Sequence, residues 1–222
     1  SFAMRCRVPV TEAPLQLLDE ARLNGQGDGP GWLAYVVPSL DSTNAEALRL
    51  LSSSPALPFY VLAERQTSGR GRRGRSWVSP FGENIYYSLV LRIDGGMRQL
   101  EGMSLAVGLA LLQVVRDCGV SSAGLKWPND VLVGERKLAG ILLELSGDPA
   151  DVCHVVIGIG LNVNMLAAEV GAIGQPWTSM RMELGRQLDR NELVCALNRQ
   201  LSHYLYIQLR HGVAALQDEW QR

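Results

Sequence analysis

The chain has 222 residues, of which 47% are hydrophobic and 19% are charged, and its formal net charge at pH 7 is −1. This composition is typical of a globular protein that can bury a core, and it excludes the low hydrophobicity and high charge of a disordered chain. A general nucleic-acid binder usually carries a clear basic excess, so the charge also weighs against that function.

Cysteine spacing and the N-terminal sequence indicate the compartment. The four cysteines have neither the spacing nor the histidine partners of a zinc site, and we interpret them as buried thiols in a reducing compartment. The sequence "SFAMRCRVPV" lacks the apolar core of a signal peptide, and the apolar run 102–115 is shorter than the ~20 residues that span a bilayer. We therefore expect a soluble, cytoplasmic protein with no membrane partner.

Helix and strand patterns alternate through the first half of the chain. The expected elements are a short amphipathic helix over 13–25, a loop over 24–31, a strand over 33–37, a helix that begins at Asp41 or Ser42, strands over 59–64 and 84–93, and a long buried helix over 97–118.

The second half contains short strands and then helices. The expected elements are strands over 124–127, 131–133 and 137–145, the last two joined as a hairpin, an apolar central strand over 152–164, and helices over 190–209 and 213–220. Strands concentrate in the middle and helices at the flanks. This order predicts an α+β fold in which helices back a mixed, largely antiparallel sheet.

The stretch "GRGRRG" over 69–74 matches the dinucleotide-binding pattern of glycines by its letters. Its context excludes that function, because a proline and a strand follow it where the pattern requires a helix. The chain also lacks kinase signatures and a Walker A motif. Alternating glycine and arginine suits a clamp for carboxylate or phosphate, and we expect it to become ordered mainly when an anion binds. On its own, however, the stretch is equally typical of a solvated surface or a nucleic-acid contact.

Three further short stretches contain polar or charged residues that are candidates for a binding site. "DSTN" over 41–44 places two hydroxyls and an amide at a helix start, which suits a neutral ligand but also simple N-capping. "LKWPND" over 125–130 is either a site or a strand end with a turn. "RKLAGILLEL" over 136–145 begins with Lys137, and spacing alone favours a hairpin lysine over a buried one.

Together with "SPFGENIY" and "GIGLNVN", these stretches occur in an order that resembles the biotin–protein ligases, from about Leu15 to the C-terminus. The resemblance implies the biotin–lipoate ligase fold, which is similar to that of class II synthetases. Lipoate– or octanoate–protein ligases share this fold without the arginine-rich loop, and they are the first alternative. A non-catalytic, biotin-sensing core of a repressor is the second, although Lys137 with Asp130 favours an enzyme.

The resemblance implies the activity of a biotin–[acetyl-CoA-carboxylase] ligase. Such an enzyme uses MgATP to convert biotin to biotinyl-5′-adenylate and then transfers biotin to a lysine of a biotin carboxyl carrier protein. The longest members add an N-terminal helix-turn-helix and a C-terminal β domain. Neither is apparent here, so we expect one catalytic domain over 1–222, with a linker-like segment over 1–30, no DNA binding, and a homodimer through the sheet edge.

The resemblance also implies roles for individual residues. The catalytic residues would be Lys137, Arg72 and Asp130, and Asp130 would also bind magnesium. The biotin site would comprise Ser42, Thr43, Asn44, Gln66, Arg70, Gly71, Arg72, Lys137 and Gly140. The ATP site would comprise Arg72, Arg75, Trp77, Lys126, Asn129, Asp130 and Asn162.

Overall fold

The computed structural model describes residues 14–148, 150, 152–166 and 173–221. Its strands form one sheet in the order β1-β2-β3-β7-β6-β5-β4, in which β1 and β2 are parallel and every other neighbouring pair is antiparallel. The strands are β1 (Leu33–Leu40), β2 (Phe59–Gln66), β3 (Ile85–Ile93), β4 (Ala123–Lys126), β5 (Asp130–Val133), β6 (Arg136–Gly147) and β7 (Cys153–Leu161). The expected mixed, largely antiparallel α+β fold is confirmed, as are all seven expected strands.

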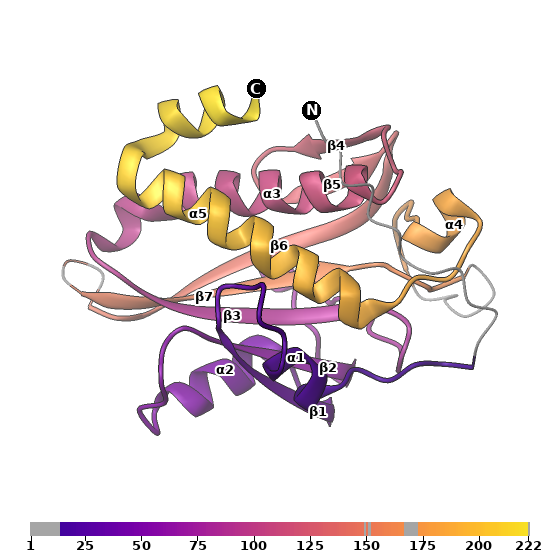
Figure 1. The fold of residues 1–222 in the computed structure, drawn as a ribbon, viewed down its shortest axis with the longest axis horizontal. Coiled ribbons are helices and arrows are strands. Elements are labelled where there is room, and N and C mark those ends of the chain that lie inside the picture. The colour runs from indigo at the N-terminus through magenta and orange to yellow at the C-terminus, as the bar shows by residue number, and fades with distance from the viewer. Residues whose placement is uncertain (1–13, 149, 151, 167–172, 222) are drawn as a thin grey trace.

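Helices cover both faces of the sheet (Figure 1). The long helices α3 (Leu100–Asp117) and α5 (Arg190–Trp220) pack against one face and enclose the main core. Helix α2 (Thr43–Leu51) packs on the other face over a small cluster that includes Phe59 and Val156. Because both faces are covered, the central strands β3 and β7 are buried along most of their length.

The predicted helix over 13–25 is much shorter in the structure. Only α1 (Glu20–Asn24) is helical, and Asp19 caps it by accepting a hydrogen bond from the Arg22 N–H. The preceding residues bond to distant parts of the chain: the Leu18 N–H donates to Glu64 Oε1 (2.6 Å), and the Gln16 carbonyl accepts from Arg190. These tertiary bonds hold backbone groups that a longer helix would use internally, which explains the difference.

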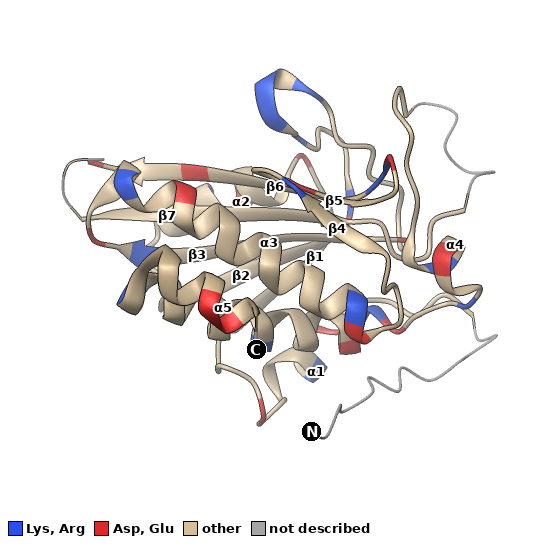
Figure 2. Ribbon diagram, turned by 90° about the horizontal axis from the view of Figure 1, so that it is seen from above, with Lys and Arg blue, Asp and Glu red and all other residues tan. Residues whose placement is uncertain are grey.

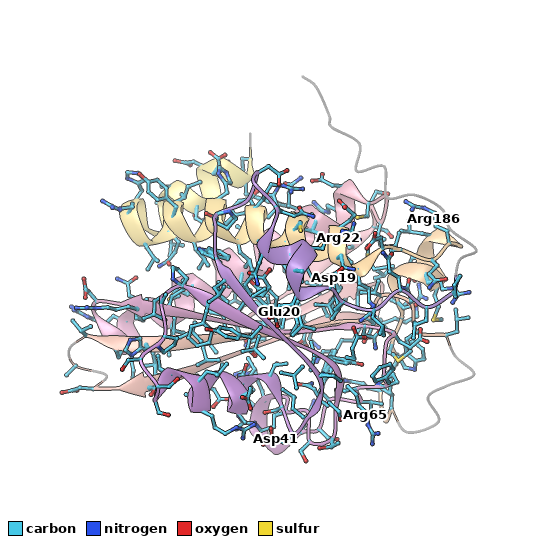
Figure 3. The ribbon with its side chains drawn as sticks, turned by 60° about the horizontal axis from the view of Figure 1, so that its bottom comes forward. Asp19, Glu20, Arg22, Asp41, Arg65 and Arg186 are labelled. Carbon is cyan, nitrogen blue, oxygen red and sulfur yellow. The ribbon has the colours of Figure 1, made fainter. Side chains whose placement is uncertain are left out.

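A buried ion pair joins this N-terminal segment to the rest of the fold. Arg190 Nη2 lies 2.8 Å from Glu64 Oε2, and both side chains are at most 4% exposed. Arg22 adds contacts to Asp189 and Glu192 at the start of α5. Figure 3 shows Arg22 beside α5, on the opposite side of the sheet from Asp41 at the start of α2.

The prediction of two helical segments at the C-terminal end, over 190–209 and 213–220, is confirmed. Gly212 interrupts α5 with φ 84° and ψ −179°, a conformation that glycine adopts readily, and the chain then folds back toward α3. The helix expected over 97–118 begins with a 3₁₀ turn, η2 (Gly96–Gln99), before α3. The short α4 (Met180–Leu184) was not predicted. Of the helices that the structure describes, none has the length and apolarity needed to cross a membrane.

Candidate active site

A cavity of about 360 Å³ opens on the face of the sheet that carries α2. Its walls come from the start of α2, the end of β2, the arginine-rich loop, the β4–β5 turn and the middle of β6 and β7. Of the predicted site residues, all except Asn162 line this cavity: Ser42, Thr43, Asn44, Gln66, Arg70, Gly71, Arg72, Arg75, Trp77, Lys126, Asn129, Asp130, Lys137 and Gly140. The fold thus brings together stretches that are far apart in sequence: the Asn44 amide, for example, donates to the Leu142 carbonyl, 98 residues away.

One end of the cavity is neutral and polar, and we call it the polar cradle: Ser42, Thr43, Asn44, Gln66 and the neighbouring Ser88. The Thr43 N–H donates to Gln66 Oε1 (2.9 Å), and Ser88 Oγ donates to Thr43 Oγ1 (2.7 Å). Ser42 caps α2 by accepting from the Ala45 N–H, so the capping interpretation of "DSTN" is confirmed while the same stretch also lines the cavity.

A strip of glycines forms the floor. A Cβ on Gly158 would lie 2.5 Å from Asn44 Oδ1, and one on Gly160 would lie 2.5 Å from Trp77 Cε2. A Cβ on Gly140 would lie 3.0 Å from Trp77 Cζ3. Real Cβ contacts are rarely this short, so glycine at these positions allows the cradle and the indole ring to lie directly on the sheet.

A β-bulge turns Lys137 toward the cavity. In the β5–β6 pairing, Val131 faces Ala139 and Leu132 faces Lys137, so Leu138 is an extra residue. Leu138 and Ala139 are both fully buried in the main core, and Lys137 therefore emerges on the opposite face, where its Cε would lie 3.3 Å from a Cβ on Gly140. The hairpin interpretation of Lys137 is therefore wrong: its side chain faces the cavity and is 19% exposed.

Lys137 meets the carboxylate of Asp130, with Nζ 3.1 Å from Oδ1. Asp130 begins β5, directly after the turn whose Pro128 carbonyl accepts from Ser104 of α3. The adjacent Asn129 donates its side-chain amide to the Ile141 carbonyl, so it fastens the turn to β6. Both charged groups thus lie on well-supported backbone at the centre of the cavity wall.

The arginine loop, residues 69–77, closes on itself. The Trp77 N–H donates to the Gly69 carbonyl (2.8 Å) and the Gly71 N–H donates to the Arg75 carbonyl (2.7 Å), around the 3₁₀ turn η1 (Arg72–Gly74). In Figure 2 this loop is the blue-banded segment that projects beyond the sheet near β5 and β6. Its guanidiniums are exposed, and Arg70 pairs with Glu144 of β6 at 3.1 Å. Ordering of the loop by an anion stays a prediction.

Trp77 stands between this cavity and a second one of about 660 Å³. Lys137 Nζ lies 5.2 Å from the centre of the Trp77 ring. The indole N–H is buried and has no hydrogen-bond partner among the residues that the structure describes. The second cavity is also lined by Trp177 and by Asn162, whose amide donates to the Thr178 carbonyl (3.1 Å). Asn162 therefore lines the second cavity, together with Arg75, Trp77 and Lys137, but not the first.

The cavity offers one carboxylate, Asp130, to a cation. In the part of the chain that the structure describes, three His, Cys, Asp or Glu side chains nowhere gather in a metal-binding group. This donor set fits Mg²⁺ bound together with a phosphorylated ligand, because one or two carboxylates, phosphate oxygens and water commonly hold that ion.

Several lining or supporting residues were not predicted, among them Ser88, Glu144 and Trp177. Glu144 could have been found from strand alternation, since Gly140, Leu142 and Glu144 share one face of β6. Ser88 is one serine within an apolar strand, and no local pattern marks it.

Comparison with known proteins supports a specific class. Residues 36–162 match the model of the biotin/lipoate A/B protein ligase family. The bifunctional ligase/repressor BirA of Escherichia coli K12 is 40% identical over 209 residues, which cover 94% of this chain and 64% of that protein. A biotin–[acetyl-CoA-carboxylase] ligase of Paracoccus denitrificans is 40% identical over 187 residues, covering 81% of this chain and 76% of that one. A biotin protein ligase of Aquifex aeolicus, solved in complex with biotin and ATP, superposes with a TM-score of 0.71 at 28% identity, over 84% of this chain and 76% of that one.

The mixed sheet carries a glycine-floored cavity that joins neutral polar groups to a lysine and an arginine loop. This fold and this site define the class of enzyme to which these relatives belong. The chain is a member of the biotin/lipoate A/B protein ligase family. It spans slightly less than two thirds, 64%, of the length of its E. coli and Salmonella typhimurium relatives.

Proposed function

We propose that this chain activates biotin with ATP to biotinyl-5′-adenylate and transfers the biotinyl group to a lysine of a biotin carboxyl carrier protein. The observation that carries the proposal is the position of Lys137, between a neutral polar cradle and a cationic loop. An elongated ligand with a neutral polar head and a terminal carboxylate matches that sequence of surfaces.

Biotin has such a head, because its ureido ring carries two N–H donors and a carbonyl acceptor. Gln66 and Thr43 would exchange part of their mutual hydrogen bonding for bonds to this ring, and Asn44 would support them. Lipoate ends in a dithiolane, which has no N–H or O–H donors. It would gain no hydrogen bonds from the cradle, whose polar groups would stay bonded to one another beside an apolar ring. The cradle therefore favours biotin.

In the first step, a carboxylate oxygen of biotin attacks the α-phosphorus of ATP, and pyrophosphate leaves. Both reactants are anionic, so the site must offset their repulsion. Lys137 would hold oxygens of the carboxylate and the α-phosphate, while Arg70, Gly71 and Arg72 would close over them. Bound magnesium would supply charge neutralisation on the phosphates, with Asp130 as its protein ligand and Asn129 nearby.

The nucleotide would extend toward the second cavity. Trp77 and Trp177 provide aromatic surface for a base, and Asn162 lies on the same wall. Lys126 and Arg75 stand on the exposed side, where the triphosphate would leave the cavity. The A. aeolicus relative, solved in complex with biotin and ATP, supports the binding of both ligands by this fold.

In the second step, the amine of the carrier lysine attacks the acyl carbonyl of the adenylate, and AMP leaves. The arginine loop would retain the adenylate until the carrier arrives. The names of the P. denitrificans and Mycobacterium tuberculosis relatives support a carboxylase carrier as the acceptor. We also propose a homodimer through a sheet edge, since β1 and β4 end the sheet.

Pyrophosphate release measured with biotin and, separately, with lipoate tests the proposal. We expect release that depends on biotin, ATP and magnesium, with little release from lipoate. Release from lipoate alone would identify a lipoyl ligase. Binding of biotin without any release would identify a sensing core and would reject the enzymatic proposal.

A further inference from the structure

Glu144 lies immediately outside the cavity, beyond the last lining residue of β6, Leu142. Its Oε1 is 3.1 Å from Arg70 Nη2 and accepts a 3.1 Å hydrogen bond from the Asn44 amide. One carboxylate oxygen therefore contacts both the first arginine of the arginine loop and the polar cradle, although the side chain is only 25% exposed.

The contacts of Glu144 begin a chain of hydrogen bonds around the cradle. Ser88 Oγ lies within hydrogen-bonding distance of both Asn44 Oδ1 and Thr43 Oγ1, and its single hydroxyl hydrogen donates to one of the two at a time. The Thr43 N–H donates to Gln66 Oε1. The Gln66 amide then donates to Ser79 Oγ (3.0 Å), and that hydroxyl donates to the Trp77 carbonyl (2.9 Å). The chain starts at one end of the arginine loop and finishes at the other, in the order Arg70, Glu144, Asn44, Ser88, Thr43, Gln66, Ser79 and Trp77.

We propose that Glu144 is a positioning residue that fastens the arginine loop to β6 and couples the loop to the polar cradle. The Arg70–Glu144 pair is the side-chain contact at the start of the loop, whereas Trp77 is held at its end by backbone and by Ser79. Loss of the Glu144 charge frees the start of the loop. Loss of the whole side chain also removes the acceptor for Asn44 and loosens the cradle.

Limited trypsinolysis without ligands tests the fastening directly, because the loop carries Arg72, Arg73 and Arg75 as cleavage sites. Mass spectrometry would follow cleavage after these three residues. Glu144→Gln should raise that rate about two- to fivefold, the range expected for one partly exposed ion pair when cleavage follows the open population. The increase should shrink in 1 M salt, which screens the pair in the parent protein.

Two further variants separate the pair from a general loss of stability. Arg70→Gln should accelerate cleavage as Glu144→Gln does, and the double variant should be no faster than either single one. Asp28→Asn removes another exposed arginine–carboxylate pair, to Arg199, away from the cavity, and serves as the matched control. It should leave cleavage of the loop unchanged.

The test of the coupling between the arginine loop and the polar cradle rests on the proposed function, because it uses biotin. Glutamine keeps a carbonyl that can accept from Asn44, so Glu144→Gln should leave biotin affinity within twofold while speeding release of pre-formed biotinyl-adenylate two- to fivefold. Glu144→Ala should weaken biotin binding as well. Unchanged loop cleavage in Glu144→Gln, or additive effects in the double variant, would overturn the fastening. Equal biotin affinities of the two Glu144 variants would overturn the coupling. The ligand-free protease data stand even if the ligase proposal fails.

Discussion

Lys137 Nζ lies 3.1 Å from Asp130 Oδ1, so the central cation of the cavity has an anionic partner on the neighbouring strand. The pair holds Lys137 at the cavity wall before any ligand binds, and both side chains remain partly exposed. Such a pair is weak enough to open, because exposed ion pairs contribute about 0.2–1 kcal/mol. An incoming phosphate could therefore form an ion pair with Lys137 while a metal ion binds the Asp130 carboxylate.

Lys137→Ala should leave the fold intact and slow adenylate formation by orders of magnitude. Removing one preorganised electrostatic contact typically costs ~2.7–4 kcal/mol, or ~100–1000-fold in rate. Pyrophosphate release measures the effect, and thermal unfolding checks the fold. Release at nearly the parent rate would reject the catalytic role of Lys137.

Gly160→Ala should disturb the site through its floor. The added Cβ would lie 2.5 Å from Trp77 Cε2, so the indole ring must move. We expect weaker binding of both biotin and ATP, measured by calorimetry. Gly124→Ala is the matched control, because a Cβ on that strand glycine meets nothing within 4 Å. Equal affinities in both variants would show that the ring position does not matter.

Trp77→Ala should weaken ATP binding more than biotin binding. Aromatic–base stacking contributes ~1–3 kcal/mol, and we expect the base, not biotin, to contact this ring. Trp177 also lines the second cavity, so Trp177→Ala provides a comparison for the same measurement. If biotin and ATP lost equal affinity in Trp77→Ala, the ring would be a structural element of the floor.

Arg72→Gly should release the adenylate prematurely. Each charge-assisted hydrogen bond contributes ~1.5–3 kcal/mol, so the off-rate should rise ~10–150-fold. Formation should suffer less, because Lys137 remains. The free adenylate would then label lysines of an unrelated protein such as added albumin. An unchanged off-rate without bystander labelling would remove Arg72 from the clamp.

The chain of residues 1–222 should not bind duplex DNA tightly at physiological salt. The sequence has only one short stretch rich in arginine and a formal net charge of −1, and phosphate contacts supply most non-specific affinity. Fluorescence anisotropy over a range of salt concentrations measures this. A submicromolar affinity with a steep salt dependence would contradict the expectation.

Local patterns in the sequence predict much of this fold. The seven strands and the long helices follow apolar periodicity, which depends on near neighbours. The prediction of a helix over 13–25 was wrong because Glu64 and Arg190, which are far away in the chain, form hydrogen bonds with the backbone of this segment. Short motifs likewise identified most of the cavity lining, since each motif keeps its residues together in space.

The remaining parts of the site depend on pairing between strands. Spacing favoured a hairpin position for Lys137, and the bulge at Leu138 that turns it inward exists only in the β5–β6 register. Ser88 and Glu144 each lie between apolar or aromatic neighbours in β3 and β6. Their partner Asn44 lies 44 and 100 residues away, so no local pattern could link them.

A single-turnover experiment with this protein, excess biotin and MgATP tests whether the chain forms and retains biotinyl-5′-adenylate. We expect one pyrophosphate per active site in a rapid burst, with biotinyl-5′-adenylate bound to the protein and AMP appearing only when a carrier protein is added. The same experiment with lipoate should give no burst. No burst with biotin, or AMP released without any acceptor at the burst rate, would contradict the proposed two-step ligase.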